Sequence, residues 1–217
     1  MMAATLRLHI GNRNYSSWSM RAWLALAHAG VAFEEVVHDL PELGEEPAFG
    51  AVSPNARVPA LDLGDGVVVA ESLAICEWAA EHAPSLWPAD PKARALARSA
   101  ASMMHAGFAD LRRDAPMNIR RRSDAARMTP EGLRDIAHVD ALWSGWLAAS
   151  GGPFLFGDWS VADAMFAPVA TRFVTYALPR SEASAAYIGA VLGEPHASAW
   201  IAGAEAETYA LPGTDAA

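Results

Sequence analysis

The most constraining feature of the sequence is a change in its apolar pattern near the start, from the alternation of a strand to a helical run. Residues 5–10 (TLRLHI) alternate apolar and polar side chains, which is typical of a half-buried strand. Turn-forming residues follow at 11–14, and residues 21–30 (RAWLALAHAG) then read as a helix closed by glycine. Where the strand passes into the helix, the chain carries three serines, Ser16, Ser17 and Ser19.

The start of a helix favours an anion, because its backbone N–H groups are unpaired and the helix dipole is positive there. A serine hydroxyl beside them donates one more hydrogen bond, so the expected guest is a thiolate or a carboxylate. The alternative is that these serines are ordinary N-cap residues. The next fifty residues help to decide between the two interpretations.

Residues 31–38 predict a second strand, parallel to the first because a helix joins the two. Residues 40–56 are rich in proline, glycine and acids, and are interpreted as irregular with a short helix. Residues 57–69 predict a β-hairpin that turns at a Gly-Asp-Gly sequence, and residues 71–82 predict another helix. The expected order is βαβαββα.

The chain from residue 91 onwards reads as helical. A helix is expected over residues 91–122, with a break at Pro116, and a second over 130–149. Ser160 and Asp163 form a capping box that opens a buried helix. Two weaker helices follow at residues 183–192 and 195–207, and the last residues are expected to fray.

Composition excludes several classes of protein. The 217 residues suffice for one domain or two small ones, and 53% are hydrophobic, enough for a core. The net charge of −9 argues against a nucleic-acid partner, so Arg120–Arg122 are interpreted as a solvated helix end. No apolar run is long enough to span a bilayer and no leader precedes the first strand, so a cytoplasmic protein with no membrane partner is expected.

Cysteine and histidine usage narrows the chemistry further. Cys76 is the single cysteine, which excludes an internal disulfide, and it is interpreted as a core residue. With no Cys-x-x-Cys pair, a thioredoxin-type redox role is excluded. The seven histidines show no paired ligand spacing, so no metal is assigned.

Four motifs, in order, resemble those of soluble glutathione S-transferases: SSWSMR at 16–21, RVPAL at 57–61, ESLAI at 71–75 and SVAD at 160–163. The resemblance covers nearly the whole chain. It implies an α/β plus all-α fold, with a thioredoxin-like glutathione-binding domain over residues 1–84 and a linker over 85–90. An all-helical domain over 91–217 would contribute the site for an electrophilic substrate.

Within that family the first motif is most similar to the zeta class. The chain has Trp18 where that class has a cysteine, which puts the isomerase activity of the class in question. Residues 104–118 also resemble an uncharacterised bacterial branch with SSWS-type motifs.

The resemblance also implies residue roles. Ser16, or else Ser17, would donate a hydrogen bond to the sulfur of glutathione, the co-substrate. Pro59 would be a cis-proline, and the Val58 backbone would pair with the cysteinyl part of glutathione. The γ-glutamyl end would be held by Glu71 and Ser72. The remaining glutathione-binding candidates are Trp18, Arg57, Arg112 and Asn118.

The expected function is therefore that of a glutathione transferase. A free thiol titrates near 8.5, and lowering its pKa by two units corresponds to roughly 2.7 kcal/mol. The thiolate would attack small hydrophobic electrophiles. The alternatives are a zeta-like, glutathione-dependent cis–trans isomerase of the maleylacetoacetate isomerase type, or a non-catalytic binding protein that keeps the fold. The resemblance also implies a homodimer.

Overall fold

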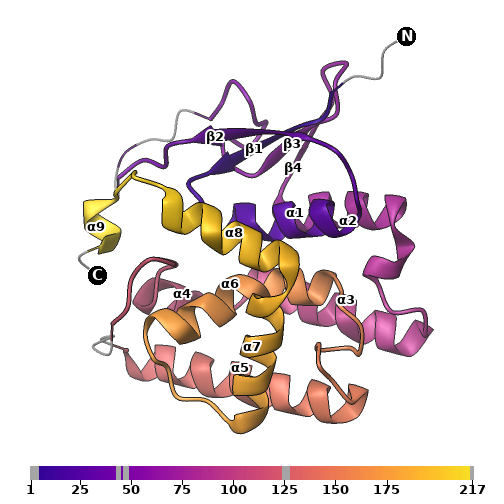
Figure 1. Ribbon diagram of the computed structural model, residues 1–217, viewed down its shortest axis with the longest axis vertical. Helices are drawn as coiled ribbons and strands as arrows, with labels where there is room; N and C mark the ends of the chain where they lie inside the picture. Colours follow the sequence, from indigo (N-terminus) through magenta and orange to yellow (C-terminus); the bar gives the residue numbers. More distant parts are fainter. Residues whose placement is uncertain (1–4, 43–44, 46–48, 124–127, 216–217) are drawn as a thin grey trace.

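The computed structural model describes residues 5–42, 45, 49–123 and 128–215, with a sheet at one end and helices at the other (Figure 1). The strands are β1 (Arg7–Gly11), β2 (Glu34–His38), β3 (Ala60–Asp62) and β4 (Val68–Ala70), arranged in the order β2-β1-β3-β4. β2 runs parallel to β1, whereas β3 is antiparallel to both of its neighbours. The predicted parallel pair and hairpin are therefore confirmed.

Two helices lie beneath the sheet, α1 (Ser17–His28) and α2 (Ser72–His82) (Figure 1). α1 begins four residues earlier than the sequence pattern indicated, because Ser16 takes the N-cap position and accepts a hydrogen bond from the Ser19 N–H. Apolar residues of β1 and α1 are fully buried between these layers, among them Leu8, Ile10 and Leu24. This packing fixes the start of α1 at the end of β1.

The rest of the chain is helical, as expected. After a short 3-10 helix, η1 (Pro84–Leu86), come α3 (Pro91–Ala106), α4 (Ala109–Asp114), α5 (Pro130–Ser150), α6 (Val161–Thr175), α7 (Glu182–Gly193), α8 (Pro195–Ala206) and α9 (Pro212–Asp215). α6 is the central helix, almost wholly buried against α1, α3 and α7. The predicted fold class, a thioredoxin-like part followed by helices, is confirmed.

The break expected at Pro116 lies elsewhere. α3 ends before Gly107, which is extended, and Phe108 is left-handed with φ 58°. A Cβ at Gly107 would lie 2.9 Å from the Met103 carbonyl oxygen, so the sharp exit from α3 needs glycine. α4 then stops before Pro116, as the steric demand of proline on its predecessor requires.

The segment at residues 40–56 and the C-terminal segment differ from expectation. The short helix expected within residues 40–56 falls partly on residues 43, 44 and 46–48, outside the described residues, and the described residues of this segment contain none. The C-terminal segment does not fray over its described part. It forms α9, whose Asp215 is held by hydrogen bonds.

Within the described parts of the chain, no helix combines the length and apolarity needed to cross a membrane.

The capping box at the start of α6 is confirmed. The Asp163 carboxylate accepts hydrogen bonds from the Ser160 N–H at 2.9 Å and the Ser160 hydroxyl at 3.0 Å. It also accepts one from the Leu155 N–H at 3.1 Å. Its complete burial nevertheless raises the pKa of Asp163 to about 6. Cys76 is a core residue, as expected, and burial raises the pKa of its thiol to about 12.

Candidate functional site

A cavity of about 670 Å³ lies where the starts of α1 and α2, the segment before β3, α4 and the C-terminal segment meet. The predicted site residues that line it are Ser16, Ser17, Trp18, Arg57, Val58, Pro59, Glu71, Ser72 and Arg112. Asn118 does not line it. The predicted residues come from four separate stretches of the sequence and meet around one space.

The two serines at the start of α1 differ in how their hydroxyls are engaged. The Ser16 hydroxyl donates to the Ser19 Oγ at 2.7 Å, and the Ser19 Oγ also accepts from the Gly11 N–H at 3.1 Å. The Ser17 hydroxyl makes no hydrogen bond to any described residue, although Ser17 is buried. Ser17 therefore presents a free donor at the positive end of α1.

The segment before β3 offers an unpaired peptide group. The Val58–Pro59 peptide is cis, as the family resemblance implied. Neither the N–H nor the C=O of Val58 is hydrogen-bonded within the described residues, and Val58 lines the cavity. An extended peptide ligand would satisfy both groups in the manner of an added strand.

The start of α2 carries a second unsatisfied hydroxyl. Ser72 is 1% exposed, and its Oγ is buried without a hydrogen-bond partner in the described structure. Glu71 precedes it with φ 73°, an uncommon conformation for a residue with a side chain. Asn55 Nδ2 donates to Glu71 Oε1 at 2.9 Å and holds this carboxylate at the cavity edge. The arrangement suits a ligand with both an anionic and a cationic group.

Trp18 forms the boundary between the sheet side and the helical side of the cavity. The Arg21 guanidinium lies 4.3 Å from its ring centroid, and that of Arg112 lies 5.0 Å away. The His105 ring meets it edge-on at 5.3 Å. Arg112 is further fixed by donating to the Gly107 carbonyl at 2.7 Å. Trp18 is therefore held by cation–π contacts rather than free to rotate.

Sequence reasoning missed a buried cation, Arg172 of α6. It lines the cavity, and its Nε donates to the Ala115 carbonyl at 2.8 Å. Burial lowers its pKa to about 10, and no described carboxylate pairs with it. Its Nη2 makes no hydrogen bond within the described residues. The sequence signal that could have identified Arg172 is a single charged residue within an otherwise apolar helix.

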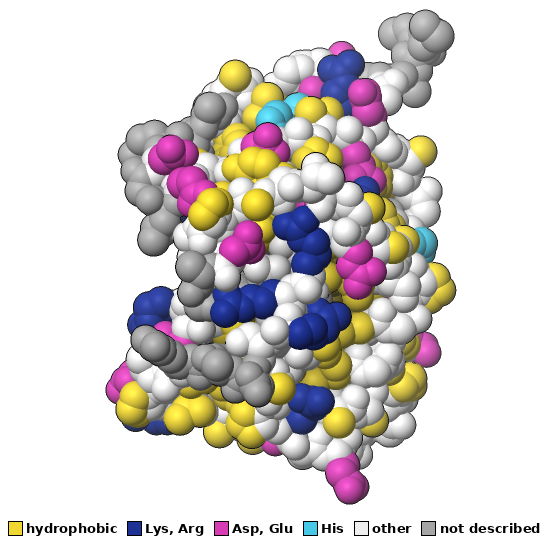
Figure 2. All heavy atoms as spheres, turned by 60° about the vertical axis from the view of Figure 1, so that its left-hand side comes forward, with side chains coloured by type: hydrophobic (Ala, Val, Ile, Leu, Met, Phe, Trp, Pro, Cys, Tyr) yellow, Lys and Arg dark blue, Asp and Glu magenta, His cyan; other side chains and the backbone are white. Residues whose placement is uncertain are grey.

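Arg21 belongs to the same positive region. It is fully buried, its Nε donates to the Met165 carbonyl at 3.1 Å, and its Nη1 and Nη2 have no partner in the described structure. Desolvation, with the nearby charges of Arg172 and Arg112, lowers the pKa of Arg21 well below its ordinary value. On one face of the molecule, basic side chains gather across the middle (Figure 2). The protein is acidic overall but positive around this cavity.

The C-terminal segment closes one side of the cavity with Leu211 and Thr214. The Tyr15 hydroxyl donates to the Asp215 carboxylate and accepts from the Leu211 N–H at 3.1 Å. Asn118 also donates to Asp215, at 2.7 Å, and lies behind this wall. No sequence motif indicated that residues 15 and 215 would meet.

The interpretation of Arg120–Arg122 as a solvated helix end is wrong. These residues are not helical, and Arg120 is half-buried. Arg120 Nη2 donates to the Tyr15 hydroxyl at 3.0 Å and to the Tyr209 carbonyl at 2.6 Å. Its charge helps to hold the C-terminal segment against the site.

Residues 15–82 match the family model described as "Glutathione S-transferase, N-terminal domain". A maleylacetoacetate isomerase from Rattus norvegicus is 30% identical over 159 residues, which cover 70% of this chain and 72% of the relative. The residues that match the family model include the starts of both α1 and α2, the two helix ends at the cavity.

Solved structures of glutathione transferases share the fold. A glutathione transferase homolog from Burkholderia with bound glutathione matches with a TM-score of 0.70 and 23% identity, covering 94% of this chain and all of its own. A theta class glutathione S-transferase from Xanthomonas axonopodis pv. citri with glutathione bound matches with a TM-score of 0.68 and 25% identity, covering 95% of this chain and 99% of its own.

Proposed function

Because this chain belongs to the glutathione S-transferase family, we propose that its cavity binds glutathione and holds the sulfur as a thiolate beside Ser16 and Ser17. The observation that carries the proposal is the meeting of two helix starts and an unpaired peptide group around one space. The start of α1 lacks a partner such as a thiolate, the start of α2 lacks a carboxylate, and the Val58 peptide group lacks a peptide backbone. Glutathione supplies all three.

The three parts of glutathione match three parts of the cavity. Its sulfur would lie at the start of α1, where the Ser17 hydroxyl is free to donate. Its cysteinyl peptide group would pair with Val58, and its γ-glutamyl carboxylate would accept from the buried Ser72 hydroxyl. The γ-glutamyl amino group would pair with Glu71.

The role of Ser16 depends on Ser19. The hydrogen bond between the Ser16 and Ser19 hydroxyls reverses its direction when both hydroxyls rotate. If Ser19 donates to Ser16, the Ser16 hydroxyl becomes free to donate a hydrogen bond to the sulfur. The thiolate would then accept from both Ser16 and Ser17. Two such bonds together with the helix dipole favour the charged form of the thiol, which lowers its pKa. The thiolate then attacks the electrophilic substrate.

Glutathione binding by calorimetry tests the proposal, with thiolate absorbance followed in the same samples. Ser16→Ala and Ser17→Ala are compared with Ser198→Ala, a serine exposed on α8 and remote from the cavity. We expect the control to match the wild type. The variant that still binds glutathione but loses the thiolate signal identifies the activating serine. An unchanged thiolate signal in both single variants and in the double variant would exclude stabilisation of the thiolate by either serine.

A second candidate function is glutathione-dependent cis–trans isomerisation of an acidic substrate. It is favoured by Arg172 and Arg112, cations at the cavity for which no ion pair with a described carboxylate is seen. The thiolate would add to a cis double bond, the resulting single bond would rotate, and loss of the thiolate would leave the trans product. A carboxylated substrate such as maleylacetoacetate, for which the rat relative is named, would pair with the guanidinium groups.

The two candidates differ in their dependence on Arg112. For an acidic substrate, Arg112→Gln is expected to raise KM by about tenfold or more, since a hydrogen bond to a charged group contributes about 1.5–3 kcal/mol. For a neutral electrophile, KM should change little. Arg134→Gln, at an exposed position of α5 that does not line the cavity, is the matched control. Equal effects of Arg112→Gln on both substrates would exclude an acidic substrate bound by this side chain.

The homodimer and the cytoplasmic location are parts of the same proposal. The homodimer is proposed from the family membership of the chain alone. Light scattering of the purified chain tests the dimer. A monomer at all concentrations would exclude it.

A further inference from the structure

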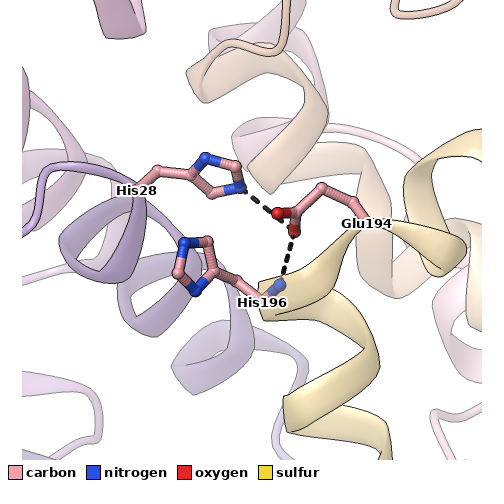
Figure 3. Close-up of side chains that lie close together, drawn as sticks. All are labelled: His28, Glu194 and His196. Carbon is pink, nitrogen blue, oxygen red and sulfur yellow. Dashed lines mark hydrogen bonds and ion pairs between the residues drawn. The ribbon is translucent and has the colours of Figure 1, made fainter.

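A second cluster of polar side chains lies at the opposite end of α1 from the serines. His28 closes α1, and Glu194 and His196 lie at the start of α8 (Figure 3). One ligand atom from each of the three side chains lies within 4.8 Å of the others. The His28 Nε2 is 3.1 Å from the Glu194 Oε2. None of the three residues lines the cavity described above.

Neighbouring groups already orient each of these side chains. The Glu194 Oε2 accepts hydrogen bonds from the His196 N–H at 2.9 Å and the Ala197 N–H at 3.0 Å. The His28 ring stacks on Trp159 with centroids 3.4 Å apart. The His196 ring lies edge-on to His28 at 4.6 Å (Figure 3). A ligand entering the cluster would therefore find it largely preorganised.

The His28 Nε2 is unusual because it is buried and makes no well-directed hydrogen bond to any described group. The nearby Glu194 oxygen is at ion-pair distance, but the direction between the two groups does not suit a hydrogen bond. A buried polar atom whose only partner is poorly directed recovers just part of its desolvation cost, which is on the order of 1–3 kcal/mol. An ion bound between the two side chains would remove that cost.

We propose that His28, Glu194 and His196 bind one zinc ion. Two imidazoles and one carboxylate form a known zinc ligand set, with a fourth position open to water. Zinc–ligand distances of about 2.0–2.2 Å place neighbouring ligand atoms about 3.3 Å apart in a tetrahedral site. The His28–Glu194 pair is already at that spacing, and the His196 ring needs to move by about 1.5 Å or less.

A simple His28–Glu194 ion pair that supports the start of α8 is the competing interpretation. It limits the His196 ring to edge-on packing against His28 and Trp23, because Glu194 binds only the backbone N–H of His196. It also predicts no response of stability to zinc. The His196 side chain therefore separates the two interpretations.

A zinc ion here would join α1 to α8, elements 166 residues apart when measured from His28 to Glu194 (194 − 28). α1 packs against α2 beneath the sheet, whereas α8 belongs to the helical part. Zinc that binds the folded chain but not the unfolded chain stabilises it, by about 2.7 kcal/mol when its concentration is 100 times Kd. The proposed ion would thus stabilise the contact between α1 and α8, and its site lies apart from the cavity.

The test uses the full-length chain after treatment with a chelator. We expect calorimetry with zinc chloride to give one ion per chain, and cobalt(II) to give the visible absorption of a site with nitrogen and oxygen ligands. His196→Ala and Glu194→Gln should each weaken zinc binding by about tenfold or more, the smallest effect usual for disturbing a metal site. Zinc should raise the melting temperature of the wild type but not of His196→Ala.

His38→Ala is the matched control, because the His38 Nε2 lies 2.9 Å from the His9 Nδ1 and this pair is the strongest rival for the metal. Circular dichroism verifies that each variant is folded. Absence of zinc binding by the wild type would overturn the proposal. So would binding that survives both His196→Ala and Glu194→Gln, or binding that is lost in His38→Ala.

Discussion

The Tyr15 hydroxyl donates a hydrogen bond of 2.9 Å to the Oδ1 of Asp215, which lies 200 residues further along the chain. Tyr15 adjoins the two serines at the start of α1, and Asp215 ends α9. This contact fixes the C-terminal wall of the cavity. It also links that wall directly to the serines.

Tyr15→Phe should therefore loosen the C-terminal wall. We expect a loss of at least about 1 kcal/mol in the free energy of unfolding, because the Tyr15 hydroxyl donates to Asp215 and also accepts from Leu211 and Arg120. Asp215→Asn tests the same contact from the other side. A double-mutant cycle measured by urea unfolding should give a coupling energy above about 0.5 kcal/mol. Additive losses would mean that the two groups do not interact in solution.

Ser72→Ala should separate binding from stability. The buried Ser72 hydroxyl has no partner within the described residues, so its removal should raise the melting temperature of the ligand-free protein. Loss of a hydrogen bond to a carboxylate should weaken glutathione binding by about tenfold or more. Calorimetry and thermal unfolding measure the two effects. A variant that is less stable and binds glutathione as tightly as the wild type would contradict this assignment.

Asp163 should impose a pH dependence on stability. Its pKa is about 6 in the folded protein, above its ordinary value of 3.8, so the folded state holds the proton more tightly than the unfolded chain. The contribution of Asp163 to the free energy of unfolding therefore falls as pH rises from about 4 to about 6. The total fall is roughly 3 kcal/mol.

Asp163→Asn removes this titration. The difference in unfolding free energy between the wild type and the variant should thus be larger at pH 4 than at pH 7. Urea unfolding at both pH values measures it, and the subtraction cancels the carboxylates that the two proteins share. A difference that grows with pH would show that the hydrogen bonds from Ser160 and Leu155 outweigh burial.

Cys76 should be inert in the folded protein. Burial raises the pKa of its thiol to about 12, and the side chain is fully covered in the core. An aromatic disulfide reagent at pH 8 should therefore titrate no thiol until denaturant is added, and then one thiol per chain. Rapid labelling of the native protein would contradict the buried placement.

Local patterns were sufficient to predict most of the fold. The change from period two to helical period located β1 and α1, and the Ser160–Asp163 pair located the start of α6. The start of α2 was predicted to within one residue, whereas the start of α1 was placed four residues too late. Their meeting at one cavity follows from the parallel β1–β2 pair and the hairpin, both of which were predicted.

The features that were missed depend on partners distant in sequence. The four-residue α9 has too few residues to be stable by itself, and Asp215 holds it through Tyr15 and Asn118. Arg172 reads in sequence as part of a helix, and only the packing of α6 brings it to the cavity. None of these contacts leaves a local pattern.

The loop before α1 takes its shape from residues near the other end of the described chain. The Arg13 N–H donates to the Glu207 Oε1 at 2.6 Å, and the Trp200 Nε1 donates to the Arg13 carbonyl at 3.1 Å. Bringing such distant residues together costs closure entropy, and contacts of this sequence separation slow folding. We therefore expect this corner of the cavity to form late, after the helices have docked. A partly folded chain would lack a competent site, so the proposed glutathione binding would report completion of the whole fold.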